Sequence, residues 1–253
     1  HTRLRTVTGV QTCALPISAG EYRWLNSWDP TNTQIPELAV PLIKAIEAAS
    51  NGTIKINAVG PETVPPFDQL QPVTAGAFQF LFTHGAYHFG TTPMLATVEA
   101  MGGTPKQRRE SGVFELVDRH YAKHGMKLLA LPQSSLPGYQ ILLRRPLPAS
   151  GDLQGFKIRG NPTYLSVINA LGASMVTLPV PEIFTSMEKG VIDGFAFPTY
   201  GVAATRLNEV SKFMLRPAMG FGTNPILVNL AAWNRMPANE QKIFLDESRK
   251  AEE

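Results

Sequence analysis

Residues 153–200 constrain the fold of this chain more than any other stretch, because strand-like and helix-like patterns alternate in them at short intervals. The first apolar run ends at Arg159. Gly160, Asn161 and Pro162 follow, and these residue types suit a turn, a helix N-cap and a first helical position. The sequence therefore predicts a strand that stops at Arg159 and a helix that begins directly after it.

Two helices and further extended segments are predicted in the same stretch. Apolar side chains recur at helical spacing over residues 165–171, and residues 175–178 resume an extended pattern. A second helix is predicted at 181–190, ahead of an apolar pair at 191–192, which we expect to be buried, and a turn at 193–194. Alternation at this spacing predicts a parallel sheet with right-handed crossovers. Beyond this stretch, apolar residues at helical spacing predict a further helix at 201–213.

Arg159 is predicted to lie at the carboxyl end of a parallel strand, where ligands bind in sheets of this kind. A guanidinium beside the amino end of the next helix is a suitable receptor for a carboxylate, which gains two parallel charge-assisted hydrogen bonds and a favourable helix dipole. The alternative is a structural ion pair between Arg159 and a nearby acid such as Asp193. The residues alone leave both alternatives open.

A second unit with the same alternation precedes this one. Its predicted elements are a strand at 21–26, a helix at 35–49, a strand at 53–58, a helix at 68–75 and a strand at 78–83. Pro41 should kink the first of these helices or mark its true start. Two such units in one chain predict an α/β protein with two lobes, each with its own sheet.

Two histidines follow the last strand of that earlier unit. His84 and His88 are four residues apart, which is half of a zinc-binding pattern. The Glu of His-Glu-x-x-His is absent and no third ligand is evident, so we predict no metal. We expect His84 or Tyr87 to face a cleft, with a position on a surface loop as the alternative.

Four aromatic residues near the predicted strand ends are candidates for a cleft or for the core, namely Trp28, Phe195, Phe197 and Tyr200. Trp28 and Phe197 occupy loop positions just past strands, so we expect those two in the cleft and Phe195 in the core. Residues 136–145 form an extended run that should cross from one lobe to the other as a hinge, with Tyr139 and Gln140 where it meets the cleft.

The amino-terminal segment has neither helical nor strand period and lacks the long apolar core of a secretory signal. Residues 1–17, HTRLRTVTGVQTCALPI, resemble the conceptual translation of a sequencing-library adapter, and we expect residues 1–20 to be a non-native or disordered leader. Without Arg3 and Arg5 the 23 basic residues fall to 21, against 20 acidic residues, so the natural part has a net charge near +1. Cys13 is the only cysteine, which excludes disulfides and thiol-ligated metal elsewhere.

Composition and motifs exclude several classes of protein. No basic cluster argues for nucleic acid or an anionic membrane surface, and no apolar run reaches the roughly 18 residues that span a bilayer. The sequence has no Gly-x-Ser-x-Gly, no Gly-x-x-x-x-Gly-Lys-Ser/Thr, no Gly-x-Gly-x-x-Gly and no zinc quartet. We therefore predict a protein that is not an enzyme and needs no cofactor.

The run GFKIRGNPTYLSVINALGASMVTLPVPEIFTSMEKGVIDGFAFP, residues 155–198, resembles the signature of the DctP-type solute receptors of tripartite ATP-independent periplasmic (TRAP) transporters. The shared features are a strand that ends in Arg, an ALGA helix end, a proline before the next helix and a G-x-[VI]-D-G motif. The resemblance implies a type II-like periplasmic-binding-protein fold that closes on a small organic acid. It also implies that Arg159 clamps the ligand carboxylate.

Several expectations rest on this resemblance. It implies a first lobe of residues 21–137 and 223–253, a second lobe of residues 138–222, and a return crossing at 218–230. It implies TRAP membrane subunits as partners and a periplasmic location, with the signal peptide missing from this sequence and a truncated carboxyl end. The expected ligand-binding residues are Arg159, Phe197, Asn161, Trp28, Tyr87, His84, Gln140, Asn26, Tyr200 and Asn224.

The sequence departs from the family pattern at two places that bear on the ligand. Many members have Glu-Asn-Pro where this chain has Ala196-Phe197-Pro198, and many carry an Arg where this chain has Gln140. The absence of this Asn and this Arg favours a ligand that is a monocarboxylate with an apolar or aromatic body over a dicarboxylate or a sugar acid. A ligand-sensing two-lobed regulatory domain and a periplasmic enzyme stay open as alternatives.

Overall fold

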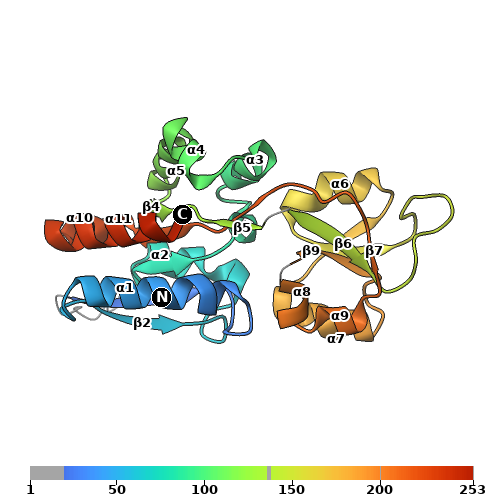
Figure 1. Cartoon of the computed structure of the whole chain (residues 1–253), viewed down its shortest axis with the longest axis horizontal. Helices are drawn as coiled ribbons and strands as arrows, with labels where there is room; N and C mark the ends of the chain where they lie inside the picture. The colour runs from blue at the N-terminus through green and yellow to red at the C-terminus, as the bar shows by residue number, and fades with distance from the viewer. Residues whose placement is uncertain (1–19, 136–137, 200, 253) are drawn as a thin grey trace, which may run out of the picture.

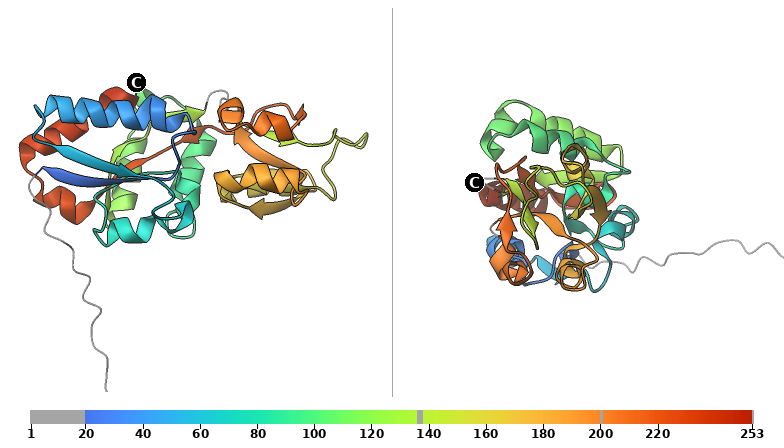
Figure 2. Two further views of the ribbon diagram at one scale, coloured as in Figure 1. Left: turned by 90° about the horizontal axis from the view of Figure 1, so that it is seen from below. Right: turned by 90° about the vertical axis from the view of Figure 1, so that its right-hand side faces the viewer.

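The computed structural model describes residues 20–135, 138–199 and 201–252 and places them in two bodies joined by extended segments (Figure 1). Each body contains one five-stranded sheet covered by helices, as the alternating pattern predicted. The side view in Figure 2 shows the two bodies separated along the long axis of the molecule. No helix in the described part of the chain is both long and apolar enough to cross a bilayer.

The sheet of the first lobe has the order β2-β1-β3-β12-β4. Its strands are β1 (Glu21–Asn26), β2 (Lys55–Val59), β3 (Phe80–Phe82), β4 (Met126–Ala130) and β12 (Ile226–Asn229). Strand β1 pairs in parallel with both β2 and β3, as crossover connections require, whereas β12 enters antiparallel between β3 and β4. The chain thus returns to complete the first sheet after it has built the second.

Helices cover both faces of this sheet. They are η1 (Ile35–Ala39), α1 (Val40–Ala49), η2 (Pro66–Asp68), α2 (Leu70–Thr74), η3 (Gly85–His88), α3 (Met94–Met101), α4 (Pro105–Glu110), α5 (Val113–Ala122), α10 (Leu230–Arg235) and α11 (Ala238–Glu252). The first two form one continuous helix that opens with a π turn. Pro41 lies where π-helical hydrogen bonding changes to α-helical hydrogen bonding. Because proline has no N–H to donate, the disturbance of the helix that was predicted at Pro41 takes the form of this π turn.

The core of the first lobe follows the two-residue period of its strands. Trp24, Phe80 and Phe82 pack on one face of the sheet, and Leu25 and Leu81 pack on the other. All five side chains are fully buried. Because both faces are covered, these strands carry large apolar residues at consecutive positions.

The sheet of the second lobe has the order β10-β6-β9-β7-β8. Its strands are β6 (Tyr139–Leu143), β7 (Lys157–Gly160), β8 (Ser174–Thr177), β9 (Gly194–Pro198) and β10 (Phe213–Met214). Its helices are η4 (Pro162–Tyr164), α6 (Leu165–Ala170), η5 (Val180–Glu182), α7 (Ile183–Glu188), α8 (Gly201–Ala204) and α9 (Leu207–Val210). Strand β7 pairs in parallel with β8 and β9, as predicted, and β6 joins β9 antiparallel.

Three local predictions in this lobe are wrong. Val191 is half exposed, and Gly194 starts β9 instead of forming a turn. A Cβ atom at Gly194 would lie 2.5 Å from the Leu142 carbonyl oxygen, so close strand approach, not a turn, requires the glycine here. The helix predicted at 201–213 breaks into α8 and α9 at Arg206, which has a left-handed φ of 59°, and Phe213 belongs to β10.

Two segments cross side by side between the lobes. Strand β5 (Gln133–Ser135) pairs with β11 (Gly222–Thr223). Just beyond this pair, the N–H of Tyr139 donates to the Met219 carbonyl and the N–H of Met219 donates to the Tyr139 carbonyl, both at 2.8 Å. The first sheet uses residues 21–130 and 226–229 and the second uses residues 139–214. Lobe boundaries at residues 138 and 222 stay a prediction.

Candidate functional site

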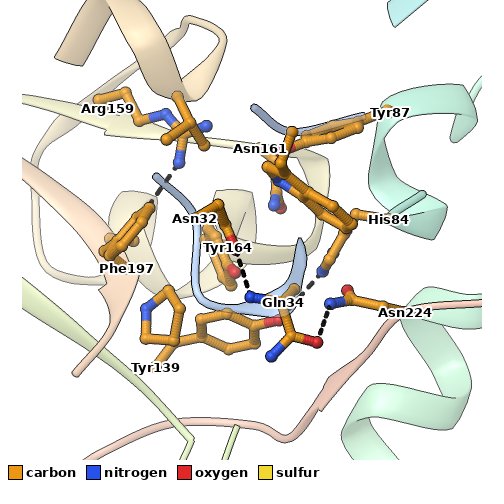
Figure 3. A pocket seen from close by; sticks show the side chains of 14 residues that line it. Asn32, Gln34, His84, Tyr87, Tyr139, Arg159, Asn161, Tyr164, Phe197 and Asn224 are labelled. Atoms are coloured by element: carbon orange, nitrogen blue, oxygen red, sulfur yellow. Dashed lines mark hydrogen bonds between the residues drawn. The ribbon is translucent and has the colours of Figure 1, made fainter. Parts of the chain in front are cut away.

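A pocket lies between the two lobes and encloses about 410 Å³ of space between atoms, part of it open to solvent (Figure 3). Its lining residues are Trp28, Asn32, Gln34, His84, Tyr87, Tyr139, Arg159, Asn161, Tyr164, Val180, Ala196, Phe197, Pro198 and Asn224. The set contains one cation and no carboxylate.

Arg159 lies in β7, with its side chain held from two directions. Its Nε donates to the Leu178 carbonyl at 2.9 Å and its Nη1 donates to the Ala196 carbonyl at 3.3 Å. The residue is only 3% exposed, and burial lowers the pKa of its guanidinium from the ordinary value, an effect that the Tyr87 hydroxyl opposes. The guanidinium is therefore fixed in place and largely shielded from water.

The structural ion pair considered as an alternative for Arg159 does not form. Asp193 accepts from the N–H of Lys157 at 2.9 Å and faces the Nε of Arg145 at 3.4 Å. Within the described residues no carboxylate lies in ion-pair contact with Arg159. A buried guanidinium without a countercharge is costly, so the pocket favours an anionic occupant.

The wall from the first lobe is aromatic. Trp28 donates from its indole Nε1 to the Tyr87 hydroxyl at 3.1 Å, and its ring packs edge-on against Phe82. The positive charge of Arg159 from the second lobe acts on the Tyr87 hydroxyl and opposes part of the effect of its burial. Burial raises the pKa of Tyr87, which keeps its hydroxyl protonated. Phe197 faces this wall from the end of β9 (Figure 3).

His84 connects the first lobe to the hinge. Its Nδ1 accepts from the N–H of Ala86 at 3.1 Å, so Nε2 is the ring nitrogen that carries a proton. Nε2 lies 3.0 Å from the Tyr139 hydroxyl and 3.0 Å from Oε1 of the buried Glu99. The Glu99 Oε1 also lies 3.4 Å from the N–H of Thr223 on the return crossing. The imidazole is thus fixed by groups from both lobes.

Asn161 and Asn224 complete the polar lining. Asn161 caps η4, because its side chain accepts from the N–H of Thr163 at 3.0 Å. Asn224 lies on the return crossing and donates from Nδ2 to Gln34 Oε1 at 3.2 Å, as Figure 3 shows. Its Oδ1 is buried and accepts no hydrogen bond from any of the described residues.

The structure brings seven of the ten predicted site residues to one pocket, namely Trp28, His84, Tyr87, Arg159, Asn161, Phe197 and Asn224. Gln140 and Asn26 lie elsewhere. Gln140 accepts from the Thr199 hydroxyl at 3.0 Å, and it alternates along β6 with Tyr139, which lines the pocket. Asn26 accepts from the indole N–H of Trp24 at 2.8 Å. Tyr200 lies outside the described residues.

Four polar residues at the site were not predicted. Asn32 and Gln34 follow β1, Tyr164 ends η4, and Glu99 supports His84 from α3. Glu99 had one usable signal, since it is the only charged residue of the helix MLATVEAM. His88 is separate from the pocket lining, with Nε2 2.7 Å from the Tyr121 hydroxyl, and no group of three potential metal ligands occurs in the described ranges.

Comparison with known proteins identifies the class of the molecule. Residues 26–253 match the family described as bacterial extracellular solute-binding protein, family 7, or DctP. The chain belongs to this family, whose TRAP members bind small ligands and work with membrane subunits. It is 28% identical to the monocarboxylate 2-oxoacid-binding periplasmic protein of Nostoc sp. over 96% of this chain and 70% of that protein.

Other relatives share shorter segments or the fold alone. The ectoine-binding periplasmic protein TeaA of Halomonas elongata is 26% identical over 52% of this chain and 39% of its own length. The Bordetella pertussis receptor DctP7, which binds pyroglutamic acid, superposes with a TM-score of 0.80 at 19% identity, over 92% of this chain and 79% of that one. A Desulfovibrio salexigens TRAP receptor with bound orotic acid gives a TM-score of 0.81 at 19% identity, over 92% and 77%. These proteins are solute receptors, not enzymes.

Proposed function

We propose that this protein is the extracytoplasmic receptor of a TRAP transporter and captures a small organic acid in the pocket between its lobes. The observation that carries the proposal is Arg159, a buried cation in the pocket with no carboxylate against it in the described structure. The relatives named above that bind 2-oxoacids, pyroglutamic acid and orotic acid all take ligands that carry a carboxyl group.

The Arg159 guanidinium supplies the anion-binding group of the proposed site. Its fixed orientation suits a carboxylate, because a planar guanidinium donates two parallel hydrogen bonds to a carboxylate. The contacts to Leu178 and Ala196 engage Nε and Nη1 and leave donors of the same group for a ligand. Preorganisation by these contacts reduces the entropy cost of binding.

The rest of the lining favours an acid with an apolar or aromatic body. Trp28, Tyr87 and Phe197 present rings to the pocket, and no second cation lines it. A dicarboxylate would leave its second charge uncompensated, which is costly in a site shielded from water. We propose a monocarboxylate for this reason.

The proposed role in transport depends on closure of the two lobes around the ligand. Since both lobes line the pocket, the ligand binds the closed form better than the open form and shifts the population toward closure. We propose that TRAP membrane subunits recognise the closed receptor in the periplasm and accept the acid from it.

Arg159→Ala should abolish binding of carboxylates and leave the fold intact. Removal of one member of a buried charge pair costs about 2–5 kcal/mol, which corresponds to a loss of affinity of about 30-fold to several thousand-fold. Arg159→Lys should bind with intermediate affinity, because it keeps the charge and loses the bidentate geometry. The measurement is isothermal titration with pyroglutamate, 2-oxo acids and aromatic monocarboxylates.

The matched control is Arg235→Ala, which removes an exposed guanidinium from α10, remote from the pocket lining. It should bind every acid as the wild type does. Equal affinities of the wild type and Arg159→Ala for the same acids would contradict the proposed role of Arg159.

A further inference from the structure

The pocket contains a second polar group whose hydrogen-bonding capacity is unmet. Asn224 is 3% exposed, and its Oδ1 has no donor in the described structure. Its Nδ2 donates to Gln34 Oε1 at 3.2 Å, and its backbone N–H donates to the Pro132 carbonyl at 3.2 Å. Backbone and side chain are therefore both held, while one buried acceptor is left open.

The orientation of the Asn224 amide follows from its neighbour. Gln34 presents Oε1, an acceptor, and Asn224 turns its NH₂ group toward it, which leaves Oδ1 facing away from Gln34. The N–H of Gln34 donates to Asn32 Oδ1 at 3.0 Å, which fixes the loop that carries Gln34. Among the described residues, Oδ1 is the end of the Asn224 amide that this arrangement leaves without a donor.

Arg159 and Asn224 lie on opposite sides of the pocket (Figure 3). Within the described ranges, Arg159 is a buried cation whose guanidinium has N–H groups beyond the two bonded to carbonyls, and Asn224 Oδ1 is a buried acceptor without a donor. A ligand that spans the pocket meets both. Leaving a buried acceptor unsatisfied costs about as much as a hydrogen bond to it would contribute, so a complementary ligand supplies a donor at this end.

We infer that the natural ligand is bifunctional, with a carboxylate at one end for Arg159 and a hydrogen-bond donor, a hydroxyl or an N–H group, at the other end for Asn224 Oδ1. This inference rests on the proposed function and narrows its ligand class. It separates hydroxy acids and lactam or amino acids, which carry such a donor, from plain aliphatic and aromatic acids of the same size.

The test compares acids that differ in one donor. The matched probes are gamma-hydroxybutyrate with valerate, pyroglutamate with 3-oxocyclopentane-1-carboxylate, and para-hydroxybenzoate with para-toluate, each titrated into the full chain. In at least one pair the donor-bearing acid should bind the wild type about tenfold more tightly, which is about 1.4 kcal/mol. Asn224→Leu should lose this preference, so that the two members of the pair bind it with similar affinity.

Controls separate this inference from the proposed function. Asn208→Leu makes the same substitution at an exposed position and should keep the preference. If Arg159→Ala abolishes carboxylate binding but Asn224→Leu keeps the wild-type preference, the carboxylate clamp stands and the inference is overturned. Equal binding of both members of all three pairs by the wild type would overturn it as well. If Arg159→Ala keeps the wild-type affinity, the proposed function fails.

Discussion

His88 shows how burial of a single residue couples folding to pH. Desolvation, reinforced by the charges of His84 and His124, lowers the pKa of His88 from 6.5 to about 3. The unfolded chain therefore binds a proton at His88 between about pH 6.5 and 3 that the folded chain does not bind. Since stability rises with pH wherever the unfolded state binds more protons, His88 destabilises the fold as the pH falls through this window.

We expect His88 to contribute up to about 1.4 kcal/mol per pH unit to the slope of the free energy of unfolding against pH. His88→Gln can still bond the Tyr121 hydroxyl and has no such titration, so its free energy of unfolding should fall less steeply from pH 6.5 to 4. Urea unfolding at half-unit pH steps measures both slopes. Parallel curves for the wild type and the variant would refute this account of His88.

Among the elements, the crossing segments depend on one glycine. Gly138 has φ of +105°, and a Cβ atom there would lie 2.4 Å from the Gly220 carbonyl oxygen and 2.8 Å from that of Met219. Both contacts are backbone atoms of the return crossing, so no side chain can move aside. Gly138→Ala should therefore force the two crossings apart and lower the free energy of unfolding by more than about 1 kcal/mol.

Gly155→Ala is the matched control for this prediction. Gly155 also has a positive φ, +78°, but its Cβ atom would meet nothing within 4 Å. The two variants share the conformational cost, and the difference between their urea-unfolding free energies isolates the clash at the crossing. A Gly138→Ala variant no less stable than Gly155→Ala would show that the crossings can separate freely.

Sequence patterns predicted the elements where local rules decide the structure. The strand that ends near Arg159 and the Asn161 cap follow from residue types over a few positions. The break at Arg206 could not be predicted, because the apolar residues of 201–213 keep helical spacing through it. Edge pairing of Phe213 with Leu143 ends the segment as a strand, and that contact is non-local.

For the pocket residues, too, the sequence predicted positions that follow from local patterns and missed those that depend on distant contacts. Arg159 and Phe197 lie at strand ends, so the topology alone places them at the ligand edge. Sequence could not show that Gln140 lies outside the pocket lining, because a hinge position does not reveal which side chain of an alternating strand faces the cleft. Glu99 and Gln34 reach the site only through packing of distant segments, and no local pattern encodes this.

At the scale of the whole molecule, the hydrogen bond between His84 and Tyr139 joins the first lobe to the first strand of the second. If this contact stabilises the closed form, Tyr139→Phe should shift the ligand-free protein toward open conformations by about 0.5–1.5 kcal/mol. Small-angle X-ray scattering should show a larger radius of gyration without ligand and the wild-type value at saturating ligand. Affinity should fall by up to about tenfold.

This pattern of results distinguishes closure from direct contact, because Tyr139 also lines the pocket. Loss of a direct ligand contact would weaken binding without any change in the radius of gyration of the free protein. Tyr121→Phe deletes the same atom from a buried tyrosine within the first lobe, where the hydroxyl bonds His88, and should leave the scattering curve unchanged. If Tyr139→Phe leaves the radius of gyration of the ligand-free protein unchanged, the hydrogen bond between His84 and Tyr139 contributes to ligand binding and not to closure of the lobes.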